Sequence, residues 1–242
     1  MAKSQNILGI DVGGTKVAAG LVDKNYRVSK ALILNTSPTD LLGQLVRLIE
    51  SYQGYNAIGI GMPGTISANG WINRLPNVKN FKAINLQKYL KDNFKVPVSV
   101  INDAAAFTLG EARLGSGKKF TKVFGVILGT GIGGGLVVGS LHKDMGSILH
   151  RKLPGLERQM QEHGSFVKAD QYKPFVKKIL RVILSSFNPQ VVIFGGKRSQ
   201  IRGMQTVLEN CWISVSHIKV SVKVSKLKHA GIIGAVLPLL KH

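Results

Sequence analysis

The 242-residue chain contains a single cysteine, Cys211. One cysteine excludes an internal disulfide framework and any zinc site built from several cysteines. No charged segment followed by an apolar run opens the chain, and no apolar run approaches the roughly 18 residues that a membrane span needs. We therefore expect a cytoplasmic protein that has no membrane partner.

Acidic residues are also scarce, because only 12 Asp and Glu stand against 33 Lys and Arg, which gives a formal net charge of +21. Residues 1–142 hold 16 of the basic residues and residues 143–242 hold 17. This even spread argues against a basic arm, so we expect no specific nucleic-acid partner, although a positive surface still attracts ATP and other phosphates. Four of the scarce carboxylates stand inside glycine-rich or apolar motifs, namely Asp11, Asp103, Glu111 and Glu157.

Two glycine-rich segments, residues 7–16 and 126–135, look like a matched pair. Each begins with a short apolar run typical of a buried strand and then turns through glycines, where backbone N–H groups can approach an anion closely. Thr15 and Thr130 add hydroxyl groups at equivalent places. Asp11 ends an apolar strand, where a carboxylate is costly unless it meets a cation or donors, so a role linked to Mg²⁺ is expected. The pair predicts a split phosphate cradle; the alternative is two tight hairpin turns with an ordinary turn aspartate.

The remaining pattern of apolar and polar residues predicts an α/β fold. Strands followed by crossover helices indicate parallel pairing, with ligands at the carboxyl ends of the strands. Pro38 is expected to open an amphipathic helix whose shared apolar face comprises Leu41, Leu45, Leu48 and Ile49. The expected strands are 7–12, 16–23, 27–35, 57–61, 97–101, 122–128, 132–139, 191–194 and 218–224, and the other expected helices are 84–93, 104–114, 172–186, 200–211 and 230–240.

Six motifs follow one another along the chain: Asp11–Lys16, Gly61–Gly64, Asn102–Ala106, Gly110–Glu111, Leu128–Gly135 and Gly195–Gly196. In this order they resemble the signature of the ROK family of sugar kinases, within the actin-like, hexokinase-like ATPase fold. The resemblance runs from about residue 7 to residue 238. It implies a two-lobed α/β fold of the ribonuclease H-like type, with mixed sheets flanked by helices and a cleft between the lobes. The lobes would comprise residues 1–113 and 114–242, with the closing helix 230–240 able to pack back on the N-terminal lobe.

The resemblance also implies roles for individual residues. Phosphates and Mg²⁺ would be held around Asp11, Gly13, Gly14, Thr15, Lys16, Gly129, Thr130 and Gly131, and the adenosine would lie against Gly195 and Gly196. Asp103 would be the catalytic base, which accepts a proton from a sugar hydroxyl as that oxygen attacks the γ-phosphoryl group of ATP. The sugar would contact Gly64, Asn77, Asn102, Asp103, His150 and Glu157. The alternative for Asn102 and Asp103 is that they merely cap the following helix.

The chain departs from the family pattern in the region where sugar specificity is expected. Family kinases commonly carry a Gly-Glu-Ile-Gly-His segment, a cysteine-rich zinc loop and a Gly-Cys-Leu-Glu segment; the best matches here are Gly146–His150 and Gly155–Glu157. Ser147 replaces a sugar-binding glutamate, and residues 151–156 contain no cysteine, so we expect no zinc. His150 is equally well explained as a partly exposed loop residue, and Glu157 as a solvated residue in the first turn of a helix.

These features predict an ATP- and Mg²⁺-dependent kinase that phosphorylates a hydroxyl of a hexose or an N-acetylhexosamine. By resemblance to the family, a homodimer is expected. The alternative is a nucleotide- or sugar-binding regulatory protein with weakened catalysis, which Ser147 and the missing zinc loop favour and the intact Asp103 disfavours. A repressor of the same family would carry a winged helix before the first phosphate motif, and we expect none because ten residues precede Asp11.

Overall fold

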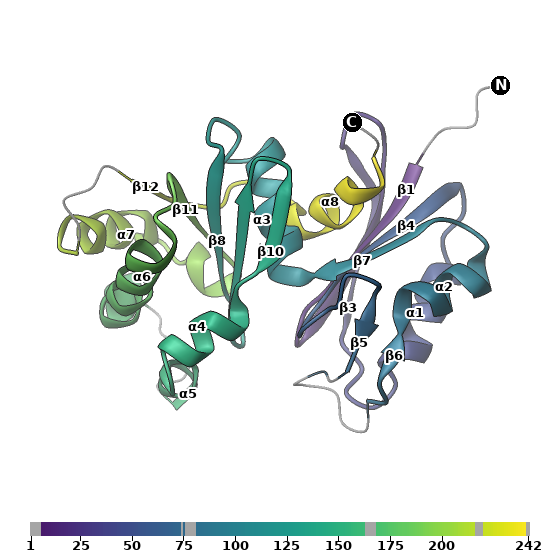
Figure 1. Ribbon diagram of the computed structural model, residues 1–242, viewed down its shortest axis with the longest axis horizontal. Coiled ribbons are helices and arrows are strands. Elements are labelled where there is room, and N and C mark those ends of the chain that lie inside the picture. Colours follow the sequence, from purple (N-terminus) through teal and green to yellow (C-terminus); the bar gives the residue numbers. More distant parts are fainter. Residues whose placement is uncertain (1–5, 74, 76–80, 163–167, 216–219, 241–242) are drawn as a thin grey trace. The chain divides into compact units, whose positions relative to one another are not determined.

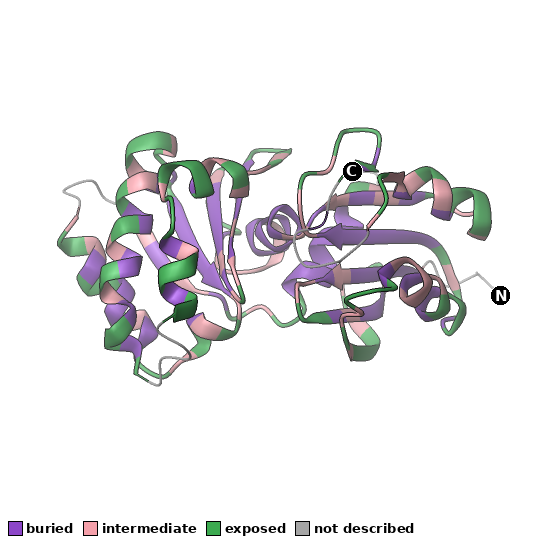
Figure 2. Ribbon diagram, turned by 90° about the horizontal axis from the view of Figure 1, so that it is seen from below, coloured by how far each residue is buried: buried purple, intermediate pink, exposed green. Residues whose placement is uncertain are grey.

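The computed structural model describes residues 6–73, 75, 81–162, 168–215 and 220–240 (Figure 1). Contacts within the chain divide it into two compact units. The first comprises Met1–Gly110 together with His229–His242, and the second comprises Glu111–Lys228. Each unit has its own five-stranded sheet and its own hydrophobic core, and buried residues are concentrated on the central strands (Figure 2).

The sheet of the first unit has the strand order β3-β2-β1-β4-β7. Its strands are β1 (Asn6–Val12), β2 (Lys16–Val22), β3 (Val28–Asn35), β4 (Tyr55–Met62) and β7 (Val98–Asn102). Short turns join β1, β2 and β3, which are therefore antiparallel, whereas β4 is parallel to both β1 and β7 because helices lie in the connections. The carboxyl ends of β1, β4 and β7 consequently lie at the same edge of the sheet.

Helices cover both faces of this sheet. Leu8 and Ile10 of β1 lie in the core shared with α1 (Leu41–Glu50) and α2 (Leu86–Phe94), whereas Ile7 packs on the opposite face with α8 (Ala230–Val236). The packing of α8 on this face requires a glycine at position 59 of β4, since a β-carbon there would overlap the backbone of Ala235 in α8. Burial on both faces explains why the parallel strands are almost continuously apolar.

Three further short elements belong to the first unit. The strands β5 (Trp71–Ile72) and β6 (Ile84–Asn85) pair with each other, and the 3-10 helix η3 (Leu237–Leu239) follows α8. The helix α3 (Asp103–Leu114) begins directly after β7, and the boundary between the two units falls within it.

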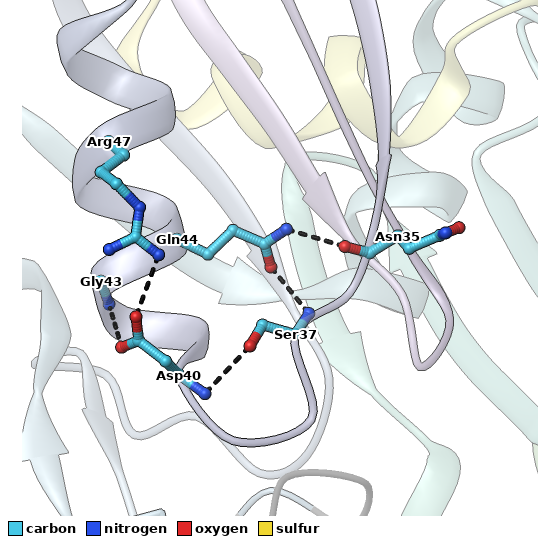
Figure 3. Close-up of polar contacts among 6 residues, drawn as sticks. All are labelled: Asn35, Ser37, Asp40, Gly43, Gln44 and Arg47. Atoms are coloured by element: carbon cyan, nitrogen blue, oxygen red, sulfur yellow. Dashed lines mark hydrogen bonds and ion pairs between the residues drawn. The ribbon is translucent and has the colours of Figure 1, made fainter.

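The α1 helix begins after Pro38 rather than at it. Asp40 is its N-cap residue, and the Asp40 carboxylate accepts a hydrogen bond of 3.0 Å from the N–H of Gly43 (Figure 3). Gln44 ties the first turn to the end of β3, because its amide donates to the carbonyl oxygen of Asn35 at 2.7 Å (Figure 3). The predicted apolar face is confirmed, since all four of its residues are buried: Leu41, Leu45, Leu48 and Ile49.

The second unit repeats the same sheet topology in the order β10-β9-β8-β11-β12. Its strands are β8 (Lys122–Leu128), β9 (Ile132–Val138), β10 (Leu141–Asp144), β11 (Val191–Gly195) and β12 (Ser221–Val224). The strands β8, β9 and β10 are antiparallel, whereas β11 is parallel to β8 and to β12. The helices are α4 (Gly146–Lys152), α5 (Leu156–Glu162), α6 (Lys173–Phe187) and α7 (Met204–Ile213), with the 3-10 turns η1 (Ala169–Tyr172) and η2 (Lys197–Gln200).

The predicted α/β class with mixed sheets flanked by helices is confirmed, and the structure corrects some details. Residues 141–162 contain β10, α4 and α5, none of which was among the predicted strands and helices, although a helix beginning near Glu157 was one alternative. The predicted helix 200–211 begins only at Met204, and the predicted helix 230–240 is interrupted at Pro238, which cannot continue an α-helix. Within the described ranges, none of the helices combines the length and the apolar character that crossing a membrane would require.

Candidate functional site

The first group of candidate residues lies at the carboxyl edge of the first sheet. Asp11 is near the end of β1, Gly64 follows β4, and Asn102 and Asp103 stand where β7 passes into α3. The side chain of Asn102 connects these segments, because its amide donates to the carbonyl oxygen of Gly64 at 3.0 Å and its oxygen accepts from the N–H of Ala105 at 3.0 Å. Asn102 is therefore the residue that caps α3.

Asp103 is the first residue of α3, and its carboxylate accepts a hydrogen bond of 2.8 Å from the N–H of the next residue, Ala104. The capping alternative thus applies to Asn102, whose oxygen reaches the third residue of the helix, as an N-cap side chain does. Asp103 is only half-buried. Its carboxylate is held at the start of a helix, where the positive end of the helix dipole favours a negative charge.

Asp11 and Asp103 stand close enough to affect each other's ionisation. Burial and, to a smaller extent, the charge of Asp103 together raise the pKa of Asp11 from 3.8 to about 7. Gly61 of β4 lies between the two residues, since a β-carbon built on it would be 3.6 Å from the Asp11 carboxylate and 3.4 Å from the Cα of Asp103. A cation at Asp11 would offset both effects, so this carboxylate suits a Mg²⁺ ion or its water ligands.

The raised pKa of Asp11 predicts a pH-dependent cost to the folded state. Between about pH 4 and pH 7 the folded protein holds a proton that the unfolded chain has released, so the folded state loses stability as the pH rises through this interval. Asp11→Asn removes the titration. We expect the free energy of unfolding of the variant, relative to the parent, to increase between pH 5 and pH 8, by at most about 3 kcal/mol.

Urea unfolding at pH 5, 6.5 and 8 in the absence of divalent cations measures this difference. Asp92→Asn is the matched control, because Asp92 is exposed and its hydrogen bond with Lys88 lowers the pKa of Asp92 instead. The control should show no increase over this interval. The prediction would be contradicted if the difference in free energy of unfolding between Asp11→Asn and the parent did not change with pH.

The first glycine turn joins β1 to β2. The N–H of Gly13 donates to the carbonyl oxygen of Lys16 at 2.8 Å, and Thr36 holds the turn from outside through its hydroxyl, which donates to the carbonyl oxygen of Gly13 at 2.8 Å. Thr15 and Lys16 are exposed, and Gly14 is partly exposed. The segment is a hairpin turn, and its exposed polar groups are available to a ligand.

The second glycine turn joins β8 to β9 in the second unit. The N–H of Gly129 donates to the carbonyl oxygen of Gly131 at 3.0 Å. A β-carbon on Gly131 would overlap the Glu157 carboxylate, which therefore lies directly against this glycine. Glu157 lies in the first turn of α5, as the alternative interpretation of this residue expected. It is not only in contact with solvent, however, because its carboxylate lies against Gly131.

His150 and Glu157 are brought together at this turn. The Nε2 atom of His150 is 3.0 Å from the carbonyl oxygen of Ile132 and 3.4 Å from the Glu157 carboxylate. Because a carbonyl oxygen can only accept, the Nε2 of His150 must carry the hydrogen. Gln161 was not foreseen as a site residue, and its amide donates to the carbonyl oxygen of Thr130 at 3.0 Å. Its spacing of four residues from Glu157 on a helix was the signal that could have indicated it.

Gly195 and Gly196 lie beside the end of β8. Gly195 pairs with Ile127 in the parallel ladder, and Gly196 has a φ of 85°, which favours glycine. A β-carbon on Gly196 would also overlap the backbone of Leu128. Ser199 fixes the turn, since its hydroxyl donates to the carbonyl oxygen of Gly196 at 2.8 Å. The two glycine motifs of this unit are therefore neighbours on adjacent strands. Asn77 lies outside the described residues.

The family model for ROK proteins, described as "ROK family", matches residues 7–144, which is more than half of the chain. The chain belongs to the ROK family. The matched part of this ROK protein includes the first glycine turn, Asn102, Asp103 and the second glycine turn.

Curated relatives of this ROK protein include sugar kinases. A glucokinase of Streptomyces coelicolor is 32% identical over 143 residues, which cover 55% of this chain and 44% of that protein. An N-acetyl-D-glucosamine kinase of Yersinia pestis is 34% identical over 137 residues, which cover 54% of each protein. The chain thus spans about half the length of the curated relatives that it matches.

A solved structure shows the fold of this ROK protein over nearly its whole length. The glucokinase of Streptomyces griseus, crystallised with glucose and AMPPNP, matches with a TM-score of 0.76 at 21% identity. The match covers 95% of this chain and 97% of that chain. The predicted actin-like ATPase fold is therefore confirmed.

Proposed function

We propose that this protein phosphorylates a hydroxyl group of a hexose or an N-acetylhexosamine, with ATP as the donor and Mg²⁺ as the cofactor. The observation that carries the proposal is the arrangement at the start of α3, where Asn102 supplies the helix cap and Asp103 stands beside it at the carboxyl edge of the sheet. Membership of a family whose curated relatives include glucokinases and N-acetylhexosamine kinases supports it.

Asp103 would act as the general base. Its carboxylate would accept the proton of the sugar hydroxyl as the oxygen forms a bond to the γ-phosphorus and the bond to the leaving ADP oxygen breaks. General-base assistance contributes roughly 10²- to 10⁴-fold in rate. Asn102 keeps one amide hydrogen and one lone pair beyond its two protein contacts, so it could still bind a sugar hydroxyl beside Gly64.

The nucleotide would be held by the glycine turns, Gly13–Lys16 and Gly129–Gly131, with Gly195 and Gly196 against the adenosine. The glycines of these turns have no side chains, which lets backbone N–H groups reach phosphate oxygens. Asp11 would hold Mg²⁺ or its water ligands, and the ion, when bound, neutralises charge on the phosphates. His150 and Glu157 would contact the sugar, with the Nδ1 atom of His150 left for a sugar hydroxyl because Nε2 donates to the carbonyl oxygen of Ile132.

Several further expectations belong to this proposal. We propose that the protein carries no structural zinc, because its single cysteine lies far along the chain from His150. A cytoplasmic location, a homodimer and the absence of a specific nucleic-acid partner are also proposed, the first from the composition of the sequence and the second by resemblance to the family.

A coupled assay of ADP release over hexoses, N-acetylhexosamines and related sugars tests the proposed function. We expect at least one of these sugars to stimulate ADP release in the presence of ATP and Mg²⁺, and chelation of Mg²⁺ to abolish the stimulation. Binding of AMPPNP without ADP release for any sugar would instead favour the regulatory alternative.

A further inference from the structure

Three consecutive residues, Thr130 and Gly131 of the second glycine turn and Ile132 at the start of β9, each contact a side chain from the α4–α5 segment. Thr130 accepts from the Gln161 amide at 3.0 Å, Gly131 lies against the Glu157 carboxylate, and Ile132 accepts from His150 at 3.0 Å. All three side chains come from residues 150–161, which lie in α4, α5 and the connection between them. The turn is therefore braced along its length from one side.

The α5 helix is suited to this bracing. Leu156 and Met160 are buried in the core of the second unit and fix one face of the helix. Glu157 and Gln161 follow each of them by one residue and are four residues apart, so they share a neighbouring face. That face contacts the glycine turn through Glu157 and Gln161, whereas Gln159, which is exposed like Gln161, lies on another side of the same helix.

We infer that Gln161 is a positioning residue for the nucleotide-binding turn. The inference rests on the proposed function, in which Gly129–Gly131 binds the phosphates of ATP. The carbonyl oxygen of Thr130 and the N–H of Gly131 belong to the same planar peptide group. By donating to this carbonyl oxygen, the Gln161 amide restricts the orientation of that N–H. A turn held in its binding conformation loses less conformational entropy when the phosphates bind. Gln161 thus contributes to nucleotide affinity without a direct contact to the nucleotide.

Gln161→Met tests the inference, because methionine keeps the length and helix propensity of glutamine but cannot donate a hydrogen bond. Gln159→Met is the matched control on the same helix. With AMPPNP and Mg²⁺ as the probe in titration calorimetry, we expect the Kd of Gln161→Met to rise about three- to tenfold, as the loss of one hydrogen bond implies. The control should stay within about 1.5-fold of the parent, and the KM for the sugar should be unchanged in both variants.

A second measurement separates the inference from the proposed function. Amide hydrogen exchange of Gly129, whose N–H is bonded within the turn, should be faster in Gln161→Met than in Gln159→Met, with or without nucleotide. If the parent does not bind AMPPNP, the proposed function is wrong, while the exchange rates still decide whether Gln161 holds the turn. Equal affinity of parent and Gln161→Met, or equal exchange in the two variants, would overturn the inference.

Discussion

Asp103→Asn should reduce sugar phosphorylation by about two to four orders of magnitude while leaving AMPPNP affinity and thermal stability close to those of the parent. The amide keeps the shape of the carboxylate, but it cannot take up the proton of the attacking hydroxyl. The structure sharpens this prediction, because the oxygen that caps α3 belongs to Asn102 and not to Asp103. Loss of the Asp103 charge should therefore lower the rate while leaving the cap of α3 in place.

Asn102→Ala supplies the contrasting variant. It removes the cap and the hydrogen bond to Gly64, so we expect it to lower the free energy of unfolding by about 1–2 kcal/mol. Steady-state kinetics, AMPPNP titration and urea unfolding on the two variants separate the proposed base, Asp103, from the cap, Asn102. Full turnover by Asp103→Asn would remove Asp103 from the mechanism and leave the capping region with a structural role alone.

Gly131→Val should weaken AMPPNP binding by about tenfold to a hundredfold, which corresponds to the loss of one or two charge-assisted hydrogen bonds. A side chain at this position displaces the Glu157 carboxylate and brings bulk to the turn that is proposed to bind phosphates. The fold should tolerate the change, because the overlapping atoms are the far end of a side chain and Gly131 is not among the glycines with a positive φ.

Glu157→Ala serves as the control for Gly131→Val, since it removes the same carboxylate contact without adding bulk to the turn. We expect it to change the Kd of AMPPNP by at most about threefold. Titration calorimetry on both variants, together with their melting temperatures, gives the comparison. A folded Gly131→Val protein that binds AMPPNP as tightly as the parent would show that this turn does not hold the phosphates.

Much of the fold could be predicted from the sequence because its signals are local. Largely apolar runs such as 7–12 and 122–128 are strands buried on both faces, and such strands are apolar along most of their length. The amphipathic spacing of Leu41, Leu45 and Leu48 is set by the helix period. The order of the motifs, from Asp11–Lys16 to Gly195–Gly196, predicted the family that the family model then showed over residues 7–144.

The α4–α5 segment was missed because its helices are seven residues each and lack a clear apolar period. Short helices of this kind depend on tertiary packing, here the burial of Leu149, Leu156 and Met160 in the core of the second unit. The sequence likewise predicted Pro38 as the start of α1, whereas hydrogen bonding selects Asp40 as the cap.

The sequence by itself determined which residue types stand at the ends of the strands, because glycines, Asp11 and Asp103 are exceptional within apolar segments. Only the tertiary structure decided which of them act on one another. Residues far apart in sequence, such as Asp11 and Asp103 or Thr130 and Gln161, meet because strand pairing and core packing bring their elements together. The raised pKa of Asp11 and the bracing of the second glycine turn follow from these long-range contacts, which no local pattern encodes.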